Sequence, residues 1–134
     1  MGEPCALRRH VEFKKEHFEL GEPMTETQSP IFAKTSNFLL WMMNHTENFP
    51  KSERFRLGKR IEDSAFDFYE ELIRAVKTND KRRILLQADL ELDKLRLYLR
   101  LAHQRKLTSH PQYLFAAESL TEIGKLLGGW LKAV

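Results

Sequence analysis

The segment Lys81-Arg-Arg-Ile-Leu-Leu-Gln-Ala-Asp-Leu-Glu-Leu-Asp-Lys-Leu-Arg-Leu-Tyr-Leu-Arg-Leu-Ala-His-Gln-Arg-Lys106 decides the fold of this chain. Its apolar residues recur every three or four positions, which is the period of an α-helix. One apolar stripe consists of Ile84, Ala88, Leu92, Leu95, Leu99 and Ala102. A second stripe, on another side of the helix, consists of Leu86, Leu90, Leu97 and Leu101. Two apolar stripes on one helix predict that one stripe packs in the core of its own bundle and that the other is covered by another chain or stays exposed.

The sequence on either side of this segment predicts three more helices. They are expected over 31–45, 53–77 and 111–133, in addition to the one over 81–106. The second has apolar residues at Leu57, Ile61, Ala65, Phe68, Leu72 and Ala75. The last has them at Ala116, Leu120, Ile123, Leu127, Trp130 and Val134. No segment alternates with a period of two, and no hairpin signal is present. Four helices with short connections predict an all-α, up-down-up-down four-helix bundle.

The turns between these helices carry the expected signals. Ser29-Pro30 is a good N-cap and first-turn pair, and Asn79 or Asp80 is placed to cap the helix that follows it. Gly21-Glu22-Pro23 interrupts the chain earlier. We therefore predict a bundle domain over 24–134 and an N-terminal extension over 1–23. The extension is interpreted as a mobile tail, with a docking arm as the alternative.

Length and composition limit the class of protein. The chain has 134 residues, the size of one domain, with 42% apolar and 31% charged residues. Its longest apolar run, Phe38 to Met43, is far shorter than the roughly 20 residues that span a membrane. The single cysteine, Cys5, excludes an internal disulfide framework. We expect a cytoplasmic protein without a secretory signal and without contact to a membrane.

The apolar surface exceeds what one bundle needs, because the first helix is apolar nearly all round and the third has two stripes. We therefore predict a homo-oligomer; the alternative is a wide core that uses all of these residues. The predicted interface consists of Phe38, Trp41, Met42, Leu86, Leu90, Leu97 and Leu101. Gly124 and Gly128 lie four apart on one face of the last helix and predict a close approach by another helix.

No catalytic constellation is visible. The sequence has no glycine-rich phosphate loop, no nucleophile elbow, and no pair of histidines four apart on a predicted helix. We expect no enzymatic activity, no metal and no cofactor. An enzyme with a site between subunits remains as a disfavoured alternative.

The basic residues form three clusters. The first is Lys51, Arg54, Arg56, Lys59 and Arg60. The second is Arg74, Lys77, Lys81, Arg82 and Arg83. The third is Lys94, Arg96, Arg100, Arg105 and Lys106. The net charge of +3 is small, so an affinity for nucleic acid depends on how these clusters are distributed. Lysine and arginine at the start of a helix oppose its dipole, which favours a binding role for Arg54 and for Lys81 to Arg83.

Arg96 and Arg100 lie one turn apart on the third predicted helix. Two interpretations apply: an intrahelical ion pair of Arg96 with Asp93, or a ring of arginines repeated around an oligomer axis that attracts phosphates or an acidic partner.

Two stretches carry a resemblance to a known family. Leu95-Arg-Leu-Tyr-Leu-Arg-Leu-Ala102 and Glu122-Ile-Gly-Lys-Leu-Leu-Gly-Gly-Trp130 resemble the Avd family, the accessory variability determinants of diversity-generating retroelements. The resemblance covers about 24–134. It places the chain in a larger group of four-helix bundles that includes proteins encoded in ribosomal RNA intervening sequences. That second branch typically has Asn-Ile-Ala-Glu-Gly late in helix 2, where this chain reads Phe68-Tyr-Glu-Glu-Leu-Ile-Arg74.

The resemblance implies a basic homopentameric barrel without catalytic activity. It implies binding to the reverse transcriptase of the retroelement and to its structured template RNA, in a complex that performs mutagenic retrohoming. The important arginines of the family correspond to Arg96 and Arg100. An intervening-sequence-type oligomer with an unknown partner is the alternative.

Overall fold

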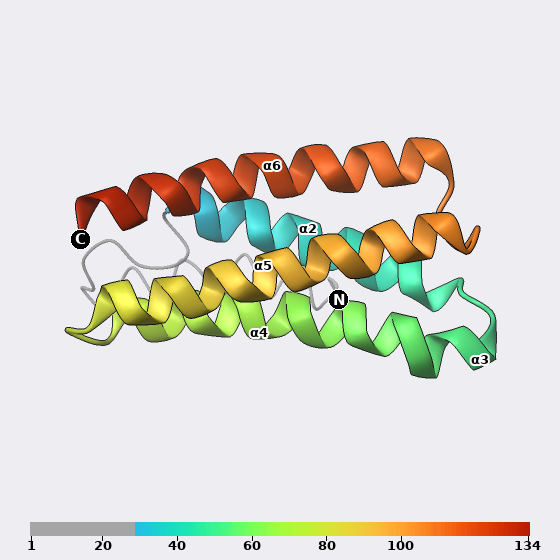
Figure 1. Ribbon diagram of the computed structural model, residues 1–134, viewed down its shortest axis with the longest axis horizontal. Helices are drawn as coiled ribbons and strands as arrows, with labels where there is room; N and C mark the ends of the chain where they lie inside the picture. The colour runs from blue at the N-terminus through green and yellow to red at the C-terminus, as the bar shows by residue number, and fades with distance from the viewer. Residues whose placement is uncertain (1–28) are drawn as a thin grey trace, which may run out of the picture.

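The computed structural model describes residues 29–134 and shows four long helical segments lying side by side (Figure 1). The first is α2 (Pro30–Glu47). The second is continuous and comprises α3 (Lys51–Glu53), the π-helical turn η1 (Arg54–Gly58) and α4 (Lys59–Val76). The third is α5 (Lys81–Gln104) and the fourth is α6 (His110–Ala133). The described residues contain no strand, so the predicted all-α four-helix bundle is confirmed for them. The extension over 1–23 and the start of the predicted domain lie outside the described residues.

The helices form a four-cornered bundle in which each helix packs on two others. Helix α2 packs against α4 and α6, and α5 packs against the same two helices from the opposite corner. The pairing of α4 with α5 is the most extensive of the four. Short turns join consecutive helices, so the chain runs up and down the bundle as predicted (Figure 1). No helix in residues 29–134 is long and apolar enough to cross a membrane.

The core consists of the predicted stripes. Every member of the stripe from Leu57 to Ala75 is at most 8% exposed. Every member of the α5 stripe from Ile84 to Ala102 is at most 4% exposed. On α6, the stripe is buried from Ala116 to Leu127, Trp130 is half-buried against the core, and Val134 is 44% exposed. Burial of a leucine-sized side chain contributes about 1.5–3 kcal/mol, so these interlocking stripes supply most of the stabilisation.

Two predicted interface residues belong to this core instead. Phe38 is 3% exposed and Met42 is 0% exposed, so neither can contact another subunit. Trp41 is half-buried and stacks on His45 with ring centroids 4.8 Å apart. Phe38 and Met42 are buried because they lie on the side of α2 that faces the bundle. The outer half of the apolar run consists of Leu40 and Met43, which are 51% and 41% exposed.

The start of α6 is fixed by a capping box. The side chain of Ser109 accepts a hydrogen bond from the backbone of Gln112, and the side chain of Gln112 accepts one from the backbone of Ser109. The predicted caps are present at the other helices, where Ser29 precedes α2 and Asp80 precedes α5, although neither side chain makes the capping bond.

A buried histidine ties α2 to the turn between α5 and α6. Nε2 of His45 shares a hydrogen bond of 2.8 Å with Oγ1 of Thr108, which is 1% exposed. The ring lies between Trp41 and Phe49. Burial lowers the pKa of His45 below its ordinary value of 6.5, because an apolar pocket disfavours the charged imidazolium.

We predict that the free energy of unfolding falls as the pH drops below 6.5. The unfolded chain binds a proton there while the folded His45 resists protonation, so acid favours the unfolded state. Denaturant titration between neutral pH and pH ~5 measures this loss, since histidine titrates in that range. The His45→Gln variant is expected to lose less stability over the same range. An equal loss in both proteins would contradict the assignment to His45.

Candidate functional site

The antiparallel pairing of α4 and α5 leaves a groove along one side of the bundle. Its volume is about 820 Å³, and its walls come from η1, from the first turns of α4 and from the second half of α5. The basic side chains in its lining are Arg56, Lys59, Arg60, Lys94 and Arg105. The groove thus joins three members of the first predicted basic cluster to two of the third, across more than thirty positions of sequence.

Acidic residues neutralise part of this groove. Glu53, which is 8% exposed, accepts a hydrogen bond from Nη2 of Arg105 at 2.5 Å and also lies 3.8 Å from Nη1 of Arg56. Lys59 pairs with Asp63 at 3.1 Å on the exposed surface, where such a pair contributes little. Glu53 therefore holds α5 against η1, while the cations around it still face the solvent.

Several cations of the groove and its rim are free of acidic partners. The guanidinium of Arg60 lies 5.9 Å from the ring centre of Tyr98 and donates to its hydroxyl at 3.4 Å. Lys51 and Arg54 are exposed and make no ion pair within residues 29–134. Asp67 also lines the groove, so the positive charge without an acidic partner at this end lies on Arg60, Lys51 and Arg54. These three cations leave room for an anionic partner.

Lys106 lies at the same end of the bundle and has an unusual backbone conformation. It follows α5 with a φ of 66°, and it is the non-glycine residue with positive φ in the described chain. Its N–H donates to His103, and the N–H of Leu107 donates to Ala102, which is the Schellman pattern of a helix end. Glycine occupies this conformation without cost, whereas a lysine there is strained.

The second basic cluster lies at the opposite end of α4 and α5 and is mostly used inside the molecule. Nζ of Lys81 donates to the carbonyls of Ala75 and Thr78 at 2.9 Å and 2.8 Å, and Arg82 donates to the carbonyl of Leu131 at 3.1 Å. Arg74 pairs with Glu71, and Arg83 pairs with Asp80. Lys81 and Arg82 thus cap the C-terminal carbonyls of α4 and α6, which offsets their unfavourable position at the start of α5. Only Lys77 of this cluster makes no ion pair or hydrogen bond through its side chain within the described residues.

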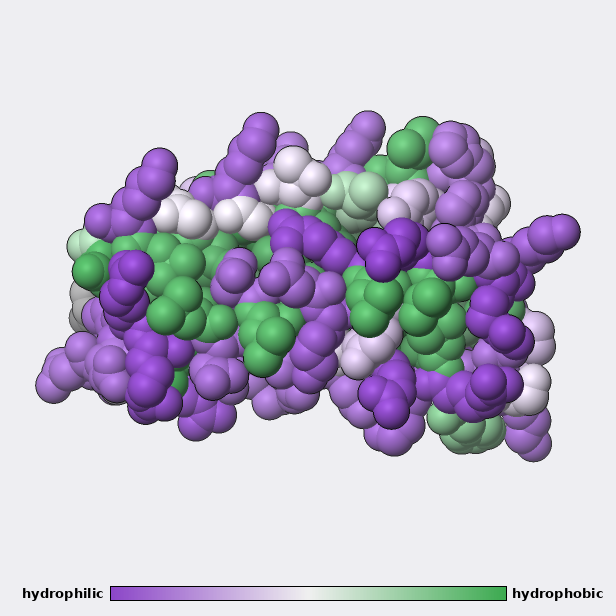
Figure 2. Space-filling view, viewed as in Figure 1, coloured by the Kyte–Doolittle hydropathy of each residue, from purple (hydrophilic) through white to green (hydrophobic). Residues whose placement is uncertain are grey.

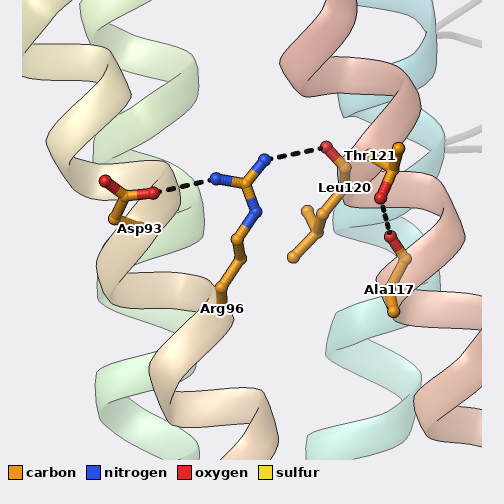
Figure 3. Close-up of polar contacts among 5 residues, drawn as sticks. All are labelled: Asp93, Arg96, Ala117, Leu120 and Thr121. Atoms are coloured by element: carbon orange, nitrogen blue, oxygen red, sulfur yellow. Dashed lines mark hydrogen bonds and ion pairs between the residues drawn. The ribbon is translucent and has the colours of Figure 1, made fainter.

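Arg96 and Arg100 lie on the other side of α5, toward α6. Nη1 of Arg96 donates to Asp93 at 2.8 Å and Nη2 donates to the carbonyl of Leu120 at 3.5 Å (Figure 3). The predicted intrahelical ion pair is thus present. The guanidinium also uses the space at Gly124, where an added Cβ would lie 2.7 Å from Nη2. The close approach predicted for the α6 glycines is therefore made by a side chain at Gly124. An added Cβ at Gly128 would meet nothing within 4 Å, so no helix of the same described chain approaches closely there.

Arg100 has no such partners. It is exposed, and its side chain makes no ion pair or hydrogen bond to residues 29–134. It lines a smaller hollow of about 210 Å³ between α5 and α6, together with Tyr113 and Thr121. Of the two arginines, Arg100 is the one whose guanidinium is available to a partner.

The second leucine stripe runs along the outside of α5 between these two basic edges. Leu86, Leu90, Leu97 and Leu101 are 49%, 52%, 38% and 37% exposed. Figure 2 views the molecule from the α5 side and shows apolar patches over this helix, bordered by polar side chains. These four leucines have the exposure that an interface requires, and their contact with a second subunit stays a prediction.

The described residues offer no constellation for a metal. Within residues 29–134, no three histidine, cysteine, aspartate or glutamate side chains gather closely enough to hold an ion.

A helical bundle with an outer apolar stripe between two basic edges has the character of a binding scaffold. Comparison with family models identifies the protein family. The bAvd-like family model matches residues 31–134, so the chain belongs to the bAvd-like family. This membership indicates an accessory role in a diversity-generating retroelement. A comparison with curated proteins finds no match.

We predict that Lys106→Gly raises the free energy of unfolding by about 1 kcal/mol, because glycine removes the strain of the left-handed conformation. Chemical denaturation measures the change. The matched control is Lys77→Gly, since Lys77 follows α4 with a φ of −97° that any residue adopts. A gain at both positions, or at neither, would contradict this account of the α5 end.

Proposed function

We propose that the protein is the non-catalytic accessory subunit of a diversity-generating retroelement, binding its reverse transcriptase and its structured template RNA. In this role it supports mutagenic complementary-DNA synthesis, which the polymerase itself carries out. The family membership gives the retroelement context. The features of this chain that support the binding are the positions and free charges of its basic side chains.

The observation that carries the proposal is the joining of two basic clusters in the α4–α5 groove. Lys51, Arg54 and Arg56 come from one segment, and Arg105 and Lys106 from another, yet all lie at one end of the bundle. A surface of this kind neutralises phosphates and releases their counterions, so its affinity for RNA falls steeply with salt. The structure offers no base-reading module in its described part, so recognition by shape and backbone is expected.

The α6 side of α5 supplies a second contact in this proposal. Arg100 is free to meet a phosphate or a carboxylate, while Arg96 is held by Asp93 and Leu120. We assign the contact with the partner to Arg100, and the positioning of the α5–α6 edge to Arg96. A homopentamer closed through the outer leucines of α5 would repeat both basic edges around one axis.

The proposal predicts which end of the bundle meets RNA. Replacing Arg54, Arg56 and Lys59 together by glutamine is expected to weaken binding of a structured RNA at least tenfold at low salt and to flatten its salt dependence, since fewer phosphates are neutralised. The change is measured by fluorescence anisotropy over a salt series, and by co-purification with the reverse transcriptase and its RNA.

The matched control is the triple glutamine variant of Arg74, Lys77 and Arg83. It removes the same formal charge from the opposite end of the bundle, away from the groove, and in both triples two of the three cations have acidic partners. We expect its RNA affinity to stay within about threefold of the parent protein. Equal losses in the two variants would show that binding follows total charge, and would contradict the groove as the RNA site.

A further inference from the structure

An exposed aromatic side chain stands in the middle of the basic surface. Phe55 is 69% exposed, the largest fraction among the exposed large apolar residues of the described chain. It makes no aromatic contact with another described residue. Leaving a phenylalanine in water forgoes the free energy that its burial would contribute, so a partner that covered this ring would gain it.

The local backbone explains why this ring faces outward. Phe55 is the second residue of η1, the π-helical turn over Arg54–Gly58. Single π-helical turns within α-helices occur often at functional sites, since the extra residue rotates side chains relative to a regular helix. Within the turn, Arg54, Phe55 and Arg56 are exposed, whereas Leu57 and Gly58 are buried. The turn therefore presents the ring on the groove side, where it is part of the lining.

The chemistry around Phe55 selects an anionic, planar partner. Arg54 and Arg56 precede and follow it, and Lys59 and Arg60 lie on the next turn. A second copy of this chain meeting the same surface would bring the same positive charges against it, which disfavours a self-contact. Single-stranded nucleic acid is complementary to this surface, because its phosphates can pair with the cations and its flat bases can stack on the ring.

The groove also has the size and the second aromatic residue for such a partner. Its volume of about 820 Å³ lies within the range of sites that bind small organic ligands, so a splayed nucleotide has room. Tyr98 lies on the opposite wall beneath Arg60, so the groove combines aromatic faces with cations. Proteins that bind unpaired RNA combine basic grooves with aromatic stacking in this way.

We propose that Phe55 is a stacking platform for an unpaired nucleotide of the bound RNA, with Arg56, Lys59 and Arg60 contacting the phosphates beside it. The inference rests on the proposed RNA binding and adds its ligand class: a single-stranded element within the structured RNA. The ring supplies affinity that is independent of charge, and the cations supply the part that salt weakens.

The test compares full-length Phe55→Leu with the parent protein. The leucine keeps the side chain apolar and removes the aromatic plane, and because Phe55 is exposed the fold is not at risk. Binding of a labelled, unstructured single-stranded RNA is expected to weaken about tenfold, the usual cost of losing one base-stacking ring. The slope of affinity against salt is expected to stay unchanged, because no phosphate contact is lost. Binding of an RNA duplex of the same length is expected to change little.

Two further variants serve as controls. Phe66→Leu replaces a second exposed phenylalanine, which belongs to α4 and does not line the groove, and this variant is expected to bind single-stranded RNA like the parent protein. Phe55→Tyr retains the aromatic plane and is expected to retain the affinity. In the parent protein, RNA carrying 5-iodouridine is expected to form a photochemical cross-link at Phe55, mapped by mass spectrometry.

The outcomes separate this inference from the proposed function. If Phe55→Leu binds single-stranded RNA as tightly as the parent while the Arg54, Arg56 and Lys59 variant is weakened, the stacking platform is wrong and RNA binding by the groove stands. If Phe55→Leu loses only the reverse transcriptase, the ring contacts protein and the inference is overturned. If the parent protein binds neither single-stranded nor structured RNA at low salt, the proposed RNA binding fails, and the platform fails with it.

Discussion

Helix α5 carries two apolar stripes on opposite sides, and a helix can turn only one side toward its own bundle. The stripe through Leu92 and Leu95 is buried against α4 and α6, which forces the stripe through Leu90 and Leu97 to face outward. The positions between the stripes must then hold the polar residues, so Lys94 and Arg105 border α4 while Arg96 and Arg100 border α6. The two basic edges and the exposed leucines are thus consequences of one pattern. In the proposed oligomer, closing the leucine face brings the basic edges of neighbouring subunits together.

The basic side chains at the two ends of the bundle have different roles. At the end of the bundle where the turn joins α4 to α5, Lys81 and Arg82 donate hydrogen bonds to backbone carbonyls at the C-terminal ends of α4 and α6. At the end with η1, Glu53 binds Arg105 and leaves Arg54 and Lys51 facing the solvent. A cation that already caps the carbonyls of a helix C-terminus is engaged within the molecule, whereas an unpaired cation beside an exposed ring can attract an external anion. The asymmetry between the two ends supports placing RNA at the η1 end.

Periodicity predicted the bundle because the core-facing stripe of each of α4, α5 and α6 is flanked along the helix by polar residues. It failed in α2, where every residue from Phe38 to Met43 is apolar and nothing in the pattern distinguishes Phe38 and Met42, which are buried, from Leu40. The three basic clusters could be recognised in the sequence, but their partners could not. Whether Lys81 reaches the carbonyl of Ala75 depends on the path of a turn, and the rotation of Phe55 depends on a π-helical turn that no spacing of apolar residues announces. The exposed leucines of α5 were predicted correctly as surface residues, since a helix cannot bury opposite sides in one small bundle.

We expect other copies of the chain to close the outer face of α5. Multi-angle light scattering of the purified protein measures this most directly, with Leu90→Glu as the matched variant on the exposed stripe. We expect a mass of about five subunits for the parent protein and a monomer for the variant, with unchanged helical content in both, because a charge on this face disrupts only contacts between subunits. A monomeric parent protein, or a variant that assembles as the parent does, would contradict it.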